Sequence, residues 1–245
     1  MKIVDINVAL DGRKPSTGER VTVEMLYEFM KAYRIDHCVA YHKKALFSPL
    51  QGNTEILRIA AESNGKIGAC VILNTLLMEA ALPGEGTLRE RLIQLHPEAI
   101  RLCPDNNHLL FHKFYWGRLL DELRGLKIPV IVDCEHSYQF WADFPAILEA
   151  YPDINFVILR SGYKRQWMMD PLLRTFPNVY VDMSIMVDGW QVEECYEIDQ
   201  CRHLVFGSGF PEFVPTGGYG LAMYADVPVS SKEGMLALNW EAMAK

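Results

Sequence analysis

The sequence predicts an α/β protein in which eight strands and their connecting helices form a (β/α)8 barrel. Three observations predict this fold class: eight short apolar runs, helical periodicity between several of them, and a length of 245 residues. Runs rich in Val, Ile, Leu, Phe and Cys are typical of parallel strands that are buried on both faces. Barrels of this class commonly have about 250 residues in a single domain. We therefore expect one barrel domain over residues 1–245.

The predicted strands follow one another at short intervals along the chain. They cover residues 3–9, 36–41, 67–73, 99–103, 128–134, 155–160, 178–183 and 203–208. Helices are expected over residues 22–33, 109–126, 140–150, 166–176 and 233–244, the last with Ser231 as its N-cap. This alternation indicates a parallel sheet. An open doubly wound sheet is the alternative, and the absence of a Gly-x-Gly-x-x-Gly turn after the first strand favours the barrel.

The composition argues against several classes of partner. The net charge is −7 and no run of Lys and Arg occurs, which argues against nucleic acid. No apolar run reaches membrane-spanning length, so no membrane contact is expected. None of the six cysteines forms a Cys-x-x-Cys pair, so we expect reduced thiols and a cytoplasmic protein. The sequence leaves the oligomeric state open, a homo-oligomer included.

Six motifs occur in order along the predicted barrel. They are Ala99-Ile-Arg-Leu-Cys-Pro104, Lys127-Ile-Pro-Val-Ile-Val-Asp133, the stretch 151–162, Phe176-Pro-Asn-Val-Tyr-Val-Asp-Met-Ser184, Leu204-Val-Phe-Gly-Ser-Gly-Phe-Pro211 and Leu238-Asn-Trp-Glu241. In this order and spacing, the chain resembles the amidohydrolase-related family of metal-dependent hydrolases. The resemblance implies a (β/α)8 TIM barrel of the metal-dependent hydrolase type. It also implies hydrolysis of an ester, lactone or amide, or a decarboxylation.

The positions that carry the metal in that family are changed in this chain. The resemblance places Asn7, Ala9, Asp133, Arg160 and Gly209 at five of these positions. Only Asp133 is a good metal ligand, Asn7 is a weak oxygen donor, and the guanidinium of Arg160 repels a divalent cation. We therefore expect no metal and no cofactor. A metal site rebuilt from neighbouring residues is the alternative.

Polar residues at the predicted strand ends define the candidate site. Side chains alternate along a strand, and ligands bind at the C-terminal strand ends of this fold. The residues expected at one cup are Asn7, Arg101, Asp133, Arg160 and Ser184, with His42 and His136 on its rim. Two arginines facing one cleft suit a carboxylate or phosphate ligand. The alternative is a buried Asp133–Arg160 salt bridge that fills a vacated site.

Two functions follow from this site. In the first, the protein is an enzyme that acts without bound metal on a small anionic compound. Asp133 is then the general base, helped by His136, while Arg160 and Arg101 hold the anion or stabilise developing charge. Asn7, Ser184 and His42 complete the ligand contacts. In the second, the protein is a catalytically inactive relative that binds a small ligand or a protein partner, so the sequence leaves enzymatic activity open.

Two further patterns have weaker functional interpretations. His108 and His112 have the i, i+4 spacing that places two imidazoles on one helical face, but we favour surface histidines at a junction between a loop and a helix. Residues 217–220, Gly-Gly-Tyr-Gly, follow the eighth predicted strand, where barrels often bind phosphate. We favour a plain loop for this segment.

Overall fold

Eight parallel strands form the centre of the molecule, as the sequence predicts. The computed structural model describes residues 1–133, 138–161, 166–213 and 216–243. The strands are β1 (Val4–Leu10), β2 (His37–His42), β3 (Ile67–Leu73), β4 (Ala99–Leu102), β5 (Val130–Asp133), β6 (Phe156–Leu159), β7 (Val179–Asp182) and β8 (Leu204–Val205). Each strand pairs with the next in chain order, and all pairs are parallel.

The sheet closes between its last and first strands. The N–H of Ile6 donates to the carbonyl oxygen of Phe206 at 3.0 Å, and the N–H of Ala9 donates to that of Phe210 at 2.8 Å. Apolar side chains such as Val39, Ile72 and Ile131 fill the interior of the ring. The predicted (β/α)8 barrel is therefore confirmed, and its lumen is a packed core rather than a pore.

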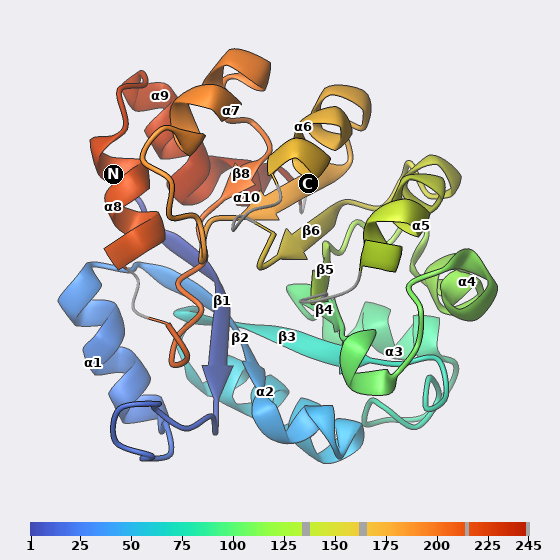
Figure 1. Ribbon diagram of the computed structural model, residues 1–245. Coiled ribbons are helices and arrows are strands. Elements are labelled where there is room, and N and C mark those ends of the chain that lie inside the picture. Colours follow the sequence, from blue (N-terminus) through green and yellow to red (C-terminus); the bar gives the residue numbers. More distant parts are fainter. Residues whose placement is uncertain (134–137, 162–165, 214–215, 244–245) are drawn as a thin grey trace.

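Helices surround the strands in a ring (Figure 1). They are α1 (Val23–Tyr33), α2 (Pro49–Glu62), α3 (Leu88–Leu95), α4 (Lys113–Leu123), α5 (Tyr138–Ala150), α6 (Gln166–Thr175), α7 (Gln191–Asp199), α8 (Thr216–Tyr224), α9 (Val229–Glu233) and α10 (Asn239–Met243). Short 3-10 turns η1 (Lys43–Leu46) and η2 (Asp105–Asn107) follow β2 and β4, and η3 (Gly234–Leu238) is a π-helical turn. The side chain of Thr22 accepts from the N–H of Met25 and caps α1.

Two sequence predictions about local structure are wrong. Ser231 lies inside α9 and does not cap a helix over 233–244, because the π-helical turn η3 separates α9 from α10. Residues 217–220 belong to α8 and are not a loop. A Cβ added at Gly218 would lie 2.6 Å from the carbonyl oxygen of Met183, so this glycine lets the helix approach the chain beyond β7 closely.

The paired histidines do not share a helical face. His108 ends η2 in a left-handed conformation, and His112 caps α4 through its side chain, which accepts from the N–H of Phe114. They therefore lie on either side of the connection between η2 and α4, and both are exposed. This confirms the prediction of surface histidines at a junction between a loop and a helix.

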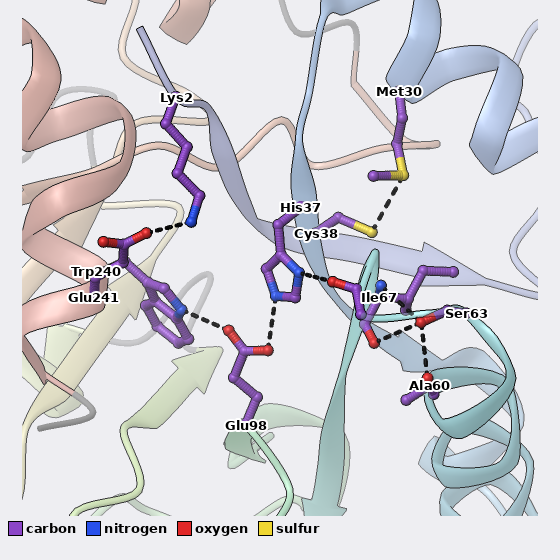
Figure 2. Close-up of polar contacts among 11 residues, drawn as sticks. Lys2, Met30, His37, Cys38, Ala60, Ser63, Ile67, Glu98, Trp240 and Glu241 are labelled. Carbon is purple, nitrogen blue, oxygen red and sulfur yellow. Dashed lines mark hydrogen bonds and ion pairs between the residues drawn. The ribbon is translucent and has the colours of Figure 1, made fainter.

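A polar cluster closes the N-terminal end of the barrel (Figure 2). The carboxylate of Glu98 accepts from the indole N–H of Trp240 at 2.9 Å and contacts Nε2 of His37 at 2.7 Å. Nδ1 of His37 lies 3.0 Å from the carbonyl oxygen of Gly65, which can only accept. Both ring nitrogens therefore face acceptors, and Glu98 raises the pKa of His37 against the opposing effect of burial. Trp240 itself packs against the apolar lumen.

Among the helices that the structure describes, none is both long and apolar enough to span a membrane.

Candidate functional site

A cavity of about 500 Å³ opens at the C-terminal ends of the strands. Its lining residues are Tyr41, Lys43, Leu46, Phe47, Asp105, Asn106, His108, Asp133, Arg160 and Glu212. We call this cavity the cup. Asp133 ends β5, Arg160 directly follows β6, and Glu212 lies in the segment after β8. Strands from different parts of the barrel thus bring charged groups to one place, where ligands bind in this fold.

Asp133 is held between two arginines. One carboxylate oxygen accepts a hydrogen bond from Nη2 of Arg101, and the other lies 3.4 Å from Nε of Arg160. Burial disfavours the carboxylate, but the charges of Arg101 and Arg160 outweigh it and hold the pKa of Asp133 below its usual value. Asp133 is therefore ionised at neutral pH. The predicted Asp133–Arg160 ion pair is present, and Arg101 makes it a three-residue cluster.

Arg101 forms the floor beneath the cup. Its side chain is only 2% exposed, and Nη1 donates to the amide oxygen of Asn7 at 3.1 Å. The guanidinium carbon also lies 4.1 Å from the centre of the Tyr41 ring, within the range of a cation–π interaction. One guanidinium thus joins β1, β4 and β5 across the lumen.

An irregularity in β1 allows Asn7 to reach Arg101. Ile6 packs in the barrel interior, although successive residues of a regular strand face opposite ways. The pairing of β1 with β2 shifts register between Asp5 and Val8. Such a shift turns a side chain to a new direction, so Asn7 also faces the lumen.

Two buried carboxyl groups, those of Asp5 and Asp182, accept hydrogen bonds from Asn7. Its amide nitrogen donates to Asp182 at 3.2 Å, and Asp182 also accepts from the hydroxyl and the N–H of Ser184. Asp5 accepts from the backbone N–H groups of Asn7 at 3.1 Å and Ser208 at 2.8 Å. Burial raises the pKa of Asp5 to about 7 and that of Asp182 to about 6. Both side chains are fully buried; Asp182 contacts the side chain of Asn7, whereas Asp5 holds the backbone of β1 and of the segment after β8.

Glu212 brings a second carboxylate into the cup. One of its oxygens pairs with Nζ of Lys43, and the other accepts from Nη2 of Arg160 at 3.2 Å. Burial disfavours this carboxylate, but Lys43 and Arg160 lower the pKa of Glu212 overall. Arg160 has a left-handed backbone with φ of 57°, which is uncommon for a residue other than glycine and recurs at functional sites.

The structure separates the predicted site residues into three groups. Asp133 and Arg160 line the cup, whereas Arg101, Asn7 and Ser184 belong to the layer beneath it. The ring of His42 accepts from the N–H of Lys44 at 3.3 Å and caps η1, so it does not line the cup. His136 lies outside the described residues.

The sequence analysis missed Tyr41, Lys43 and Glu212 as members of the site. Glu212 follows Gly209 by three residues, so a search for the next carboxylate after the changed position would have found it. Gly209 has φ of 69°, and a Cβ added there would lie 2.5 Å from Cδ2 of Phe213. An aspartate at position 209 therefore does not fit the present backbone.

The donor set does not suit the metal that the sequence resemblance implies. The amide oxygen of Asn7 and a carboxylate oxygen of Asp133 both accept from Arg101, and Arg160 lies against the other oxygen of Asp133. These permanently charged guanidinium groups would repel a divalent cation. In the part of the chain that the structure describes, no group of three or more His, Cys, Asp or Glu residues could hold a metal ion.

Among the comparisons with known proteins, the solved structures match this chain in fold. No family model and no curated protein matches the sequence. An uncharacterized TIM-barrel protein from Bordetella bronchiseptica matches with a TM-score of 0.78 and 14% identity, over 100% of this chain and 99% of that one. Amidohydrolase II is among the other solved structures that match. The chain has the same (β/α)8 fold as these proteins.

Two further neighbours have described activities. One is 5-carboxyvanillate decarboxylase from Sphingomonas paucimobilis, with a TM-score of 0.75, 9% identity, and coverage of 99% of this chain and 98% of that one. The other is a probable 2-pyrone-4,6-dicarboxylic acid hydrolase from Acinetobacter baumannii, solved with citric acid bound, with a TM-score of 0.69 and 12% identity. It covers 100% of this chain and 99% of that one. At these identities, the likeness shows the fold.

Proposed function

We propose that the cup binds a small anionic compound through Arg160 and Lys43. The supporting observation is the carboxylate of Glu212, which lies between these two cations with one oxygen on each. A ligand carboxylate has the same shape and charge, and charge-assisted hydrogen bonds of this kind are among the stronger ones in proteins. The cavity beside the pair has room for a small molecule.

The proposed site works without a metal. Arg101 contacts Asn7 and Asp133, and these are two of the positions at which the family resemblance implies metal ligands. A buried cation therefore already neutralises Asp133. Because Arg101 is 2% exposed and touches the carboxylate, we assign it as a positioning residue that keeps Asp133 in place rather than as an anion contact. We also propose a cytoplasmic location, which the free buried thiols Cys38, Cys70, Cys103, Cys195 and Cys201 support.

The proposed reaction is hydrolysis of an ester, lactone or amide, or a decarboxylation. In hydrolysis, ionised Asp133 takes a proton from a water molecule, the water oxygen attacks the substrate carbonyl, and Arg160 stabilises the resulting oxyanion. The oxyanion then re-forms the carbonyl, the bond to the alcohol or amine breaks, and this leaving group takes the proton from Asp133. The decarboxylase and the pyrone dicarboxylic acid hydrolase with the same fold support this kind of chemistry. His136 stays a predicted helper of the base, outside the described residues.

One observation favours the alternative, a ligand-binding protein without turnover. Both oxygens of Asp133 are engaged by arginines, and its pKa is lowered, which makes the carboxylate a weaker base. Anion binding is common to both candidates, whereas proton abstraction belongs to the enzyme alone.

A thermal-shift screen with small carboxylates and phosphates tests the shared part of the proposal. We expect at least one small anion to stabilise the wild-type protein, and Arg160→Ala to abolish that stabilisation. Arg118→Ala is the matched control, because Arg118 is exposed on α4. If no small anion stabilises the wild type, or Arg160→Ala responds equally, the site is assigned wrongly.

Turnover separates the two candidates. Each stabilising anion is incubated with the protein, and its ester, lactone or amide derivatives are tested for hydrolysis and the acid itself for release of carbon dioxide. The enzyme candidate predicts a product that disappears in Asp133→Asn. Binding of the anion without any product, in both proteins, establishes the alternative instead.

A further inference from the structure

A second hollow continues from the cup along the face of the barrel. It has a volume of about 600 Å³ and is lined by Asp11, Arg13, Arg20, Lys43, Lys44, Phe47 and Glu212. Lys43, Phe47 and Glu212 line both cavities. The Lys43–Glu212 ion pair therefore stands between the two, and the exposed ring of Phe47 borders each of them.

The charge of this hollow differs from that of the chain as a whole. Four of its lining residues are cationic and two are acidic, while the chain has a net charge of −7. Arg20 pairs with Asp11 at 2.7 Å, and Lys43 pairs with Glu212. The positive surplus thus comes from Arg13 and Lys44, both exposed. A local surplus of positive charge on an acidic protein attracts anions.

The backbone places two of these cations opposite each other. Arg13 and Arg20 are partners in an antiparallel bridge that follows β1. Nη1 of Arg13 donates to the carbonyl oxygen of Gly18 at 2.8 Å, which holds the guanidinium near the turn. Asp11 is the acidic partner of Arg20, so an anion bound beside Arg13 would supply a second negative charge to the two opposed guanidinium groups.

We propose that the ligand of this protein carries two anionic groups, one bound in the cup and the other bound in the second hollow. The first group takes the position between Lys43 and Arg160, and this part rests on the proposed function. The second, a carboxylate or a phosphate, lies against Arg13, Arg20 and Lys44. Because the first group replaces Glu212, the connecting part of the ligand passes beside Lys43 and packs on the ring of Phe47. The substrate class is therefore an elongated dianion.

Isothermal titration calorimetry with defined probes tests this assignment. The probes are linear α,ω-dicarboxylates of increasing length, monocarboxylates of matched length, and ω-phosphonocarboxylates. We expect dicarboxylates above a threshold length to bind about tenfold more tightly than matched monocarboxylates, since each charge-assisted contact adds affinity. Tighter binding of the phosphonates than of the dicarboxylates would identify the second group as a phosphate, and the reverse order would identify a carboxylate.

A double variant locates the second group. Arg13→Gln with Lys44→Gln is expected to abolish the advantage of the dianions and to leave monocarboxylate affinity unchanged within about twofold. Lys31→Gln with Arg118→Gln removes the same charge from exposed positions on α1 and α4 and should preserve the advantage. Lys44→Gln alone checks that the result does not arise from a changed turn at Arg13.

The outcomes separate this inference from the proposed function. If monocarboxylates bind but no dianion binds more tightly, or if the advantage persists in the double variant, the second hollow is not a binding site. If neither class of probe binds the wild type, the cup itself is not an anion site.

Discussion

The two ends of the barrel hold a carboxylate in similar ways but to different effect. At the N-terminal end, Glu98 contacts Trp240 and His37, and Trp240 is 3% exposed. At the C-terminal end, Asp133 contacts Arg101 and Arg160, and Arg160 reaches a second carboxylate across an open cavity. Neither Glu98 nor His37 lines the cup or the second hollow, so we assign the N-terminal cluster to folding. The open cluster can exchange one internal partner for a ligand, which is why the function is placed there.

The largest expected effect comes from removing the floor of the cup. Arg101→Met should lower the free energy of unfolding by about 3–5 kcal/mol, because it leaves the buried charge of Asp133 and the amide oxygen of Asn7 without their donor. Urea denaturation measures the change. Arg118→Met, at an exposed position, should stay within about 0.5 kcal/mol of the wild type.

A second variant checks the cause of that loss. Combining Arg101→Met with Asp133→Asn should cost less than the sum of the two single changes, because the buried carboxylate that Arg160 alone then balances is absent. Strict additivity would mean that Arg101 contributes packing alone.

The two buried acids Asp5 and Asp182 should make the free energy of unfolding depend on pH. Folding raises the pKa of Asp5 to about 7 and of Asp182 to about 6, above the usual value of 3.8. Their contribution is therefore complete below about pH 4 and is lost progressively as the pH rises to about 6 for Asp182 and about 7 for Asp5. We expect a loss on the order of 4 kcal/mol from Asp5 and about 3 kcal/mol from Asp182, measured by urea denaturation at each pH.

Asp5→Asn is the matched variant for this pH dependence. It keeps an oxygen that can accept from Asn7 and Ser208, but it cannot ionise. The variant should flatten the pH profile and leave a smaller slope from Asp182. An unchanged profile would show that Asp5 does not titrate over this range.

Restoring the aspartate of the related family at position 209 sharpens the contrast between the cup and a metal site. Gly209→Asp should lower the free energy of unfolding by about 1–2 kcal/mol, because the backbone is left-handed and the new Cβ meets Phe213. Gly209→Ala should lose a similar amount, since the strain comes from the Cβ. Elemental analysis should detect no bound divalent ion in Gly209→Asp, and one ion per chain would contradict our account of Arg101.

The smallest effect on stability is expected at the N-terminal end of the barrel. Trp240→Phe removes the indole N–H that donates to Glu98 and should cost about 1 kcal/mol of stability. Anion affinity, measured by calorimetry, should not change. Altered affinity would mean that the two ends of the barrel are coupled through the core.

The sequence predicted the barrel because its strands are buried on both faces. Each of the eight apolar runs overlaps an observed strand, and β1 and β2 each extend one residue beyond the predicted run, to Leu10 and His42. Helix α8 was not predicted because its glycines signal a loop, while the close approach to Met183 that requires Gly218 is visible only in three dimensions. The π-helical turn between α9 and α10 likewise has no signal in helical periodicity.

The site was predicted only where a strand fixes the direction of a side chain. Asp133 and Arg160 were found because the family resemblance places them at two metal-ligand positions, and the carboxyl ends of the neighbouring strands β5 and β6 bring them together. Glu212 and Lys43 lie in segments after β8 and β2, and their meeting depends on how those segments fold back. Asn7 lies beneath the cup because of the register shift in β1, which the sequence does not show.

The most direct test of the central claim is calorimetric titration of a small carboxylate, such as benzoate, into protein treated with a chelator. Our account predicts that binding survives the chelator, because Arg101 and Arg160 occupy the place of a metal. It also predicts about tenfold tighter binding in Glu212→Gln, where the internal carboxylate no longer competes for Lys43 and Arg160. Binding that requires an added divalent ion, or that weakens in Glu212→Gln, would contradict it.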